Sequence, residues 1–210
     1  MPKDTVGRYL AQHAEPLARG IDAGLRPAKH AICIPLYDED ERFIETLNSL
    51  DSVEGIGDAV VVLVVNGAED TPSTVHDANR AFLGWLRHTL GTAASSVTST
   101  ERNGTQFLVI DCASPGRRFP ARQGVGLARK LAGDVALALH RQGTLASPWV
   151  ACTDADVQLP ADYLTALPPH NSPHSAVVYP FAHTLEGDSS QQNAMKQYEA
   201  YLHYYVPVSY

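Results

Sequence analysis

Residues 30–66 read HAICIPLYDEDERFIETLNSLDSVEGIGDAVVVLVVN, and this stretch decides the fold class. It contains two short apolar runs rich in Val and Ile, residues 30–35 and 59–65, which are typical of strands buried on both faces. Between them, apolar residues recur at helical spacing from Phe43 to Leu50. A strand, a helix and a second strand in this order predict an α/β unit whose parallel strands are joined by a right-handed crossover.

The same alternation of apolar strands and helical stripes continues along the chain. Residues 106–111, 148–153 and 175–179 have the length and composition of buried strands, and a longer helical stripe runs from Ala121 to Ala138. Residues 92–105 are rich in Ser and Thr without periodicity, which predicts a surface loop. We therefore expect an α/β fold with a mainly parallel central sheet and helices on both faces.

Both ends of the chain lie outside this alternation. Residues 1–28 predict an N-terminal helical extension, and residues 187–210 predict a C-terminal helix that is rich in tyrosine. One face of this second helix would carry Ala194, Met195, Tyr198, Tyr201, Leu202 and Tyr205. Such a face could pair two copies of the chain into a homodimer.

Composition and charge exclude several classes of protein. The chain has 210 residues, of which 44% are apolar, and this length predicts one domain with a full core. The longest apolar run, residues 59–65, is far shorter than the ~20 residues of a membrane span, so no transmembrane segment is expected. Residues 1–20 are interrupted by charges, which argues against a signal peptide. The net charge of −7 argues against a general nucleic-acid binder.

The cysteines indicate the redox compartment. Cys33, Cys112 and Cys152 are odd in number and far apart, so they fit neither a disulfide framework nor a zinc motif. Each lies in or at the end of an apolar stretch, and we expect all three to pack as small buried hydrophobes. This usage indicates a cytoplasmic location.

Polar residues follow three of the expected strands, in the turns 35–41, 66–70 and 153–157. Ligands of open parallel sheets bind at the carboxyl ends of the strands, where these turns would meet. The pair Asp154 and Asp156 is the sharpest feature, since carboxylates at positions i and i+2 can both reach one Mg²⁺ or Mn²⁺ ion. A solvated turn with two surface acids is the alternative, and Asp38 or Asp40 could instead cap the helix that follows.

A basic cluster on an acidic chain would complement such a metal. No acid lies between Asp111 and Asp134, where the basic residues are Arg117, Arg118, Arg122, Arg129 and Lys130. Arg122, at the start of the expected helix and followed by Gly124 and Gly126, is best placed to meet a phosphate at a helix N-terminus. Alternatively these side chains are solvated or pair with surface acids, and Arg129 could reach back to the acidic pair at 154–156.

Taken in order, four segments resemble the nucleotide-sugar-binding part of family 2 glycosyltransferases of the GT-A fold. Residues 32–50 look like that family's opening strand, Pro-x-Tyr-Asn-Glu loop and helix. Residues 64–70 are similar to its second strand and Asp-Gly-Ser turn. Residues 122–130 resemble its Gly-x-x-x-Ala-Arg-Asn helix, and residues 153–163 match its Asp-x-Asp segment with a Pro-Asp-Tyr helix start.

The resemblance implies a Rossmann-like GT-A core over residues 29–186. It implies an enzyme that transfers a sugar from a nucleotide-diphospho-sugar to a hydroxyl of an unidentified glycan, lipid or small molecule. Asp154 and Asp156 would hold Mn²⁺ or Mg²⁺ on the donor phosphates. The residues implied to contact the donor are Pro35, Tyr37, Asp38, Glu39, Asn66, Arg122, Arg129 and Asp154.

The chain also departs from the family's pattern. Asn66 stands where the family commonly has an Asp that faces the base. The general base and acceptor segments of the family come well after Asp-x-Asp, and here Glu186 or Asp188 could be the base, or an acid that caps the following helix. His183 could be a third metal ligand or a structural residue. The helix in 187–210 would then begin an acceptor region that is missing, shortened or supplied by a partner.

Two other functions stay open on the sequence. A catalytically degenerate domain would bind nucleotide or pair through the tyrosine-rich helix without transferring sugar. A sugar-phosphate nucleotidyltransferase would carry a Gly-rich loop with Arg and Lys after its first strand, where this chain has the acidic residues 38–41.

Overall fold

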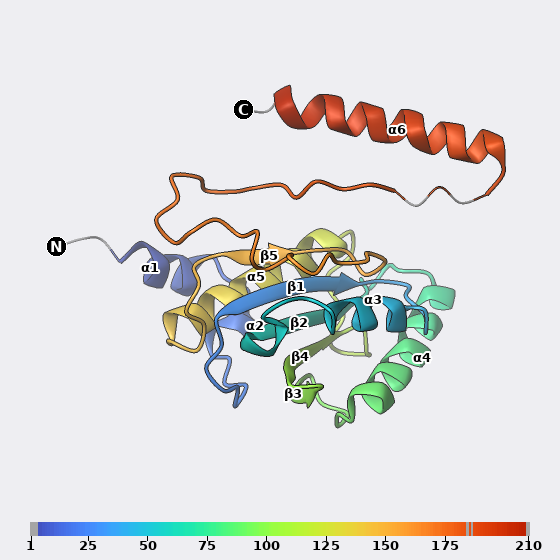
Figure 1. Ribbon diagram of the computed structural model, residues 1–210. Coiled ribbons are helices and arrows are strands. Elements are labelled where there is room, and N and C mark those ends of the chain that lie inside the picture. Colours follow the sequence, from blue (N-terminus) through green and yellow to red (C-terminus); the bar gives the residue numbers. More distant parts are fainter. Residues whose placement is uncertain (1–3, 184, 186, 209–210) are drawn as a thin grey trace. The chain divides into compact units, whose positions relative to one another are not determined.

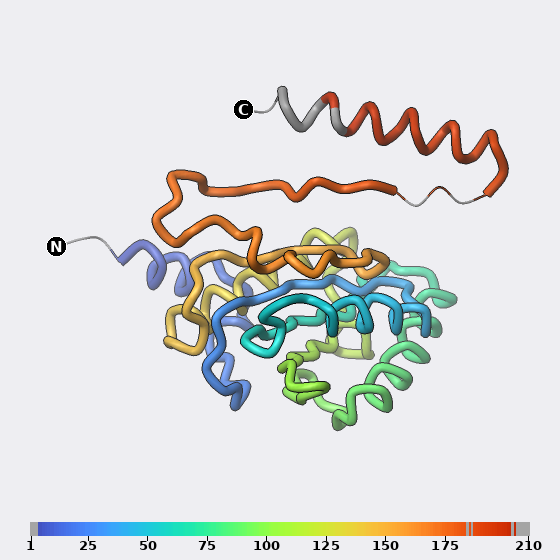
Figure 2. The backbone as a smooth tube through the Cα atoms, in the orientation of Figure 1, coloured from blue at the N-terminus to red at the C-terminus, as the bar shows by residue number. Residues whose placement is uncertain are grey.

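The computed structural model describes residues 4–183, 185 and 187–208. The chain divides into two compact units, residues 1–170 and 171–210, and each is described by itself. Figure 1 labels the elements, and Figure 2 traces the backbone through them. In chain order they are α1 Thr5–Gln12, α2 Pro16–Arg19, β1 His30–Leu36, α3 Phe43–Leu50, a 3-10 helix Ile56–Asp58, β2 Ala59–Asn66, α4 Ser73–Leu90, β3 Val97–Arg102, β4 Thr105–Cys112, α5 Val125–Arg141, β5 Val150–Cys152 and α6 Ser189–Val208.

The first unit is built on a five-stranded sheet in the order β3-β4-β2-β1-β5. Four of the strands are parallel, and only the edge strand β3 runs antiparallel to its neighbour β4. This confirms the α/β class and the mainly parallel sheet. The carboxyl ends of β1, β2, β4 and β5 therefore meet at one edge of the sheet, which we call the carboxyl edge.

The strand order explains which helices cover which face. The chain moves from β1 through β2 to β4 in one direction and then crosses back to β5. Since crossovers are right-handed, α3 and α4 belong on one face and α5 on the other (Figure 1). Along β1, Cys33 faces α5 and packs with its Ala128 and Leu131, while Ile32 and Ile34 are fully buried on the opposite face.

The N-terminal extension packs on α5 as two short helices with an irregular segment after them, residues 20–27, in place of one helix. Its buried anchor is Asp134, whose carboxylate accepts hydrogen bonds from the Tyr9 hydroxyl and the Glu15 backbone N–H, both at 2.8 Å. Lys130 binds the same carboxylate at 2.7 Å and Glu15 at 3.0 Å. Polar contacts to one buried acid thus fix the extension to the sheet unit.

Two expectations about strands were wrong. The supposed loop 92–105 contains β3, which forms a hairpin with β4 through Asn103 and Gly104, both at positive φ. Asn-Gly is the preferred two-residue hairpin turn, so this signal was present in the sequence. Residues 175–179 form no strand. They lie between Pro173 and Pro180, which lack N–H donors for a sheet ladder, and Val178 is 60% exposed.

Candidate functional site

The carboxyl edge brings together three of the predicted turns. Asp38 and Glu39 follow β1, residues 67–70 follow β2, and Asp154 and Asp156 follow β5. Because β2, β1 and β5 are neighbours in the sheet, these turns are adjacent. Asp38 adopts a left-handed backbone conformation with φ of 57°, and Tyr37 beside it is 38% exposed. Pro35, by contrast, is buried inside β1, where it pairs with Val64.

The turn after β5 is fixed to α3 by hydrogen bonds. The Thr46 hydroxyl donates to the Ala155 carbonyl at 2.5 Å, and the Leu159 N–H donates to the Ser49 hydroxyl at 3.2 Å. Ala155 is buried, while Asp154 and Asp156 on either side of it are exposed. Because exposed and buried residues alternate here, both carboxylates face outward, while the hydrogen bonds to α3 fix the backbone of the turn.

Asp154 is in contact with a cation from α5. An ion pair joins Arg129 Nη2 to Asp154 Oδ1, between side chains that are 46% and 58% exposed. This confirms the expectation that Arg129 reaches back to the acidic pair. The same edge carries Cys152, whose pKa is lowered by a hydrogen bond from Cys33 and by the charge of Arg129, against the effect of burial.

The charge of Asp156 acts on a different residue, Glu39. Burial raises the pKa of the Glu39 carboxyl above its ordinary value, and the negative charge of Asp156 raises it further. Two acids from the turns after β1 and β5 thus share one region of the carboxyl edge. Across the part of the chain that the structure describes, no group of three or more His, Cys, Asp or Glu side chains is arranged to hold a metal. The predicted metal site consists of the two carboxylates that the sequence indicated.

Asn66 connects the carboxyl ends of β1 and β2. Its side chain is fully buried, and Nδ2 donates to the Leu36 carbonyl at 2.9 Å. Asn79 of α4 continues the network, because its Nδ2 donates to the Asn66 carbonyl and its Oδ1 accepts from the Asp38 N–H at 3.0 Å. Asn66 Oδ1 is buried without a hydrogen-bond partner among the described residues. The role of Asn79 was not predicted. The sequence feature that could have indicated it is an amide side chain on the apolar stripe of an amphipathic helix.

Arg122 is positioned by its backbone. It adopts a φ of 64°, and its N–H donates to both carboxylate oxygens of Asp70 at 3.0 and 3.1 Å. A bridge between Ala68 and Phe119 joins the same two loops. The Arg122 backbone therefore lies beside the turn after β2, its side chain is exposed, and its expected contact with a phosphate stays a prediction.

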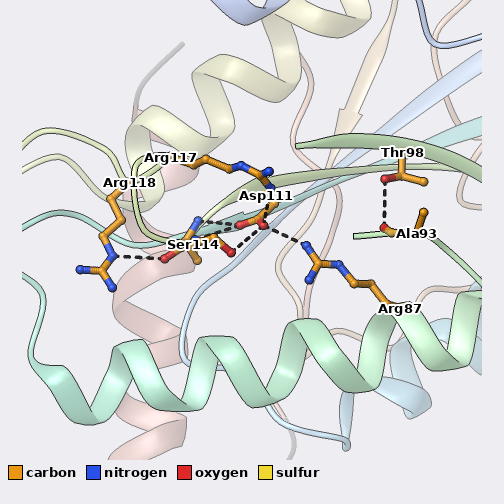
Figure 3. Close-up of polar contacts among 8 residues, drawn as sticks. Arg87, Ala93, Thr98, Asp111, Ser114, Arg117 and Arg118 are labelled. Atoms are coloured by element: carbon orange, nitrogen blue, oxygen red, sulfur yellow. Dashed lines mark hydrogen bonds and ion pairs between the residues drawn. The ribbon is translucent and has the colours of Figure 1, made fainter. Parts of the chain in front are cut away.

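The other members of the basic cluster, Arg117, Arg118 and Lys130, are engaged by groups of the protein itself. Figure 3 shows Arg117 on Asp111, together with Arg87 from α4, each at 2.9 Å. Burial alone would raise the pKa of the Asp111 carboxyl, but hydrogen bonds from Ser114 and Ala113 and the charge of Arg87 hold it below its ordinary value. Arg118 donates to the Ala113 carbonyl at 3.3 Å, and Lys130 belongs to the Asp134 cluster.

Of the two predicted catalytic acids, only Asp188 is among the described residues, and it belongs to the second unit. Glu186 lies outside the described residues. Asp188 accepts hydrogen bonds from the N–H groups of Ser190 and Gln191, so it caps α6, which is the alternative that the sequence left open. The His183 ring contacts Phe181 and Tyr198.

No family model, curated protein or solved structure matches this chain. In the described part of the chain, no helix is both long and apolar enough to cross a membrane.

Proposed function

We propose that the unit 1–170 binds a nucleotide-diphospho-sugar with Mn²⁺ or Mg²⁺ and takes part in sugar transfer, as a family 2-like glycosyltransferase or its donor-binding part. The observation that carries this proposal is the arrangement at the carboxyl edge. Asp154 and Asp156 point outward from a held turn, and Arg129 lies on the first of them. This is the edge where open α/β sheets bind their ligands.

The donor set suits a hard divalent cation that is shared with phosphates. Mg²⁺ and Mn²⁺ prefer oxygen ligands, and Mg²⁺ usually takes one or two carboxylates from the protein and the rest from phosphates and water. Asp154 and Asp156 are both exposed, and the charge of Asp156 acts on Glu39 in the turn after β1, so carboxylate oxygens are available at this edge. When bound, such an ion would stabilise the charge that grows on the departing nucleoside diphosphate.

Different residues of the chain would bind different parts of the donor. Arg129 and Arg122 are exposed guanidinium groups at this edge, and arginine binds phosphate oxygens in a bidentate manner. The turn 37–39 would lie near the nucleoside, and Asn66, which is fully buried, would support that turn through its hydrogen bond to the Leu36 carbonyl. The acidic turn 38–41 disfavours the nucleotidyltransferase alternative, since phosphates would meet carboxylates there. The base that deprotonates the acceptor stays a prediction, with Glu186 and Asp188 as candidates.

A melting-temperature assay tests the proposal. Mn²⁺ together with UDP, GDP, ADP or TDP should raise the melting temperature of the wild-type chain, because a ligand that binds only the folded state stabilises it. Replacing Asp154 and Asp156 by Ala should remove the shift, whereas Asp162→Ala, an exposed acid in the next turn, should keep it.

The outcomes separate the proposal from its alternatives. The absence of a shift with all four nucleotides would contradict donor binding. A shift without hydrolysis or transfer of any matching sugar nucleotide would favour the catalytically degenerate domain.

A further inference from the structure

Two of the three cysteines lie side by side at the edge of the sheet, and the proposed function uses neither of them. Cys33, in the middle of β1, pairs in register with Cys152, the last residue of β5. Registered residues on neighbouring parallel strands face the same side of the sheet, and the strands lie about 4.8 Å apart. This separation falls within the range of about 4.4–6.8 Å between Cα atoms that disulfides span. The two thiols are close enough to affect each other's pKa, which is raised for Cys33 and lowered for Cys152.

The two cysteines differ in their access to solvent. Cys152 is exposed, whereas Cys33 has no exposed surface. The pair is held from both sides, because the Thr153 N–H donates to the Cys33 carbonyl at 3.1 Å and the Tyr163 hydroxyl donates to the Cys152 carbonyl at 3.2 Å. An accessible thiol therefore has a second thiol fixed beside it and shielded from reagents.

We propose that Cys33 and Cys152 form an oxidative modification site, at which a hydroperoxide converts the two thiols into an intramolecular disulfide. The exposed Cys152 thiol takes an oxygen atom from the peroxide, which becomes water when the oxidant is hydrogen peroxide, and forms a sulfenic acid. The Cys33 sulfur then attacks the Cys152 sulfur; the S–O bond breaks, and the hydroxyl leaves as water with the thiol proton. Two thiols and one peroxide thus give one disulfide and two waters.

The disulfide would stabilise β5, a strand with few pairing residues. β5 has three residues and pairs with β1 alone, so a covalent bond at its last residue ties the edge strand to the middle of the sheet. The bond would form two residues before Asp154, directly behind the turn that carries both carboxylates. The inference does not depend on the proposed function, since it needs only the register that places Cys33 beside Cys152.

The third cysteine provides an internal control. Cys112 is 5% exposed at the end of β4, and β2 separates β4 from β1 in the sheet. Its thiol therefore cannot reach either member of the pair without unfolding. Cys112→Ala should oxidise like the wild type, whereas Cys152→Ala should form no intramolecular disulfide.

Mass spectrometry of the full chain tests this site. The folded protein is treated with hydrogen peroxide, quenched, denatured and alkylated, and its intact mass and tryptic peptides are measured. We expect the loss of two hydrogens, alkylation of Cys112 alone, and a disulfide between peptides 30–42 and 142–196. Sulfinic or sulfonic acid on Cys152 with Cys33 still alkylated would overturn the proposal, as would a Cys152-linked dimer on a non-reducing gel. The wild-type peptide map decides the question even if a variant fails to fold.

Discussion

At the scale of single residues, the arginines near the carboxyl edge divide into two groups. Arg87 and Arg117 neutralise Asp111, a carboxylate whose side chain is 1% exposed, and so they belong to the fold. Arg122 and Arg129 are exposed, and their contacts leave the guanidinium groups accessible to a ligand. The exposure of the partner carboxylate, 1% for Asp111 and 58% for Asp154, separates structural cations from candidate phosphate ligands, although all but Arg87 come from one cluster in the sequence.

Asp111→Asn should destabilise the protein by about 3 kcal/mol, because two partly exposed arginines lose a buried partner. The pKa of this carboxyl is lower in the folded protein than in the unfolded chain. Its contribution is therefore complete above the unfolded value of about 3.9 and is lost as the pH falls towards the folded value. Urea unfolding should show a large difference between wild type and variant at pH 7 and a smaller one at pH 3. Asp77→Asn, which breaks an exposed pair with Arg80, should change little at either pH.

Arg129→Ala should separate a functional role from a structural one. The exposed ion pair with Asp154 contributes at most about 1 kcal/mol to stability, so the unfolding free energy should hardly change. The affinity for a nucleoside diphosphate should fall about tenfold or more, as expected on losing a charge-assisted contact. Arg141→Ala is the matched control, because Arg141 forms an equally exposed pair with Asp4 at the other end of α5. Equal losses of affinity in the two variants, measured by calorimetric titration, would refute a specific role for Arg129.

Single residues were predictable where strand order alone determines their position. Asp154, Asp156 and Arg129 follow from motifs at the ends of elements, and the structure brings Arg129 and Asp154 together. The Asp111 cluster and the Asn66–Asn79 network could not be derived in this way. They depend on which helix crosses which strand end, and that information lies in tertiary packing.

At the scale of elements, burial determines how well patterns predict structure. The strands β1, β2 and β4 are buried along their whole length, and their predicted bounds differ by no more than one residue at either end. β3 lies at the edge with a half-exposed face, so its Ser and Thr residues resembled a loop. At 175–179 the apolar content predicted a strand, but in the described structure the segment pairs with no strand.

The β3–β4 hairpin turn should be sensitive to its glycine. Gly104 has a φ of 81°, and a Cβ there would meet no atom within 4 Å, so Gly104→Ala introduces only backbone strain of about 1 kcal/mol. The same substitution at Gly84, inside α4 and equally free of neighbours, should stabilise the protein by about 0.5–1 kcal/mol through helix propensity. Opposite shifts of the urea midpoint are expected. Shifts of the same sign would show that the hairpin turn is not as described.

At the scale of the whole molecule, the two units divide the predicted residues. Every residue that the resemblance assigns to the donor and the metal lies within 1–170, whereas both candidate bases lie within 171–210. The buried apolar residues of the first unit run from Ala14 to Leu164. The proposed function therefore predicts that donor binding survives the removal of residues 171–210.

A chain that ends at His170 should unfold cooperatively, within a few degrees of the full protein, and should keep its response to Mn²⁺ and nucleotide. Deleting residues 1–28 should be far more harmful. It removes the Tyr9 and Glu15 partners of the buried Asp134, and hydrogen bonds to a charged group contribute about 1.5–3 kcal/mol each. Thermal unfolding by circular dichroism checks both truncations. A loss of cooperativity on removing 171–210 would contradict the division into units.

The central claim, a metal-assisted donor site at the carboxyl edge, is tested most directly by Mn²⁺ binding itself. Electron paramagnetic resonance can follow free Mn²⁺ during titration with protein in the presence of a nucleoside diphosphate. The account predicts that wild type and Asp162→Ala deplete the free Mn²⁺ signal beyond what the nucleotide alone does, and that the double variant of Asp154 and Asp156 to Ala does not. Equal depletion by all three proteins, or by none of them, would contradict it.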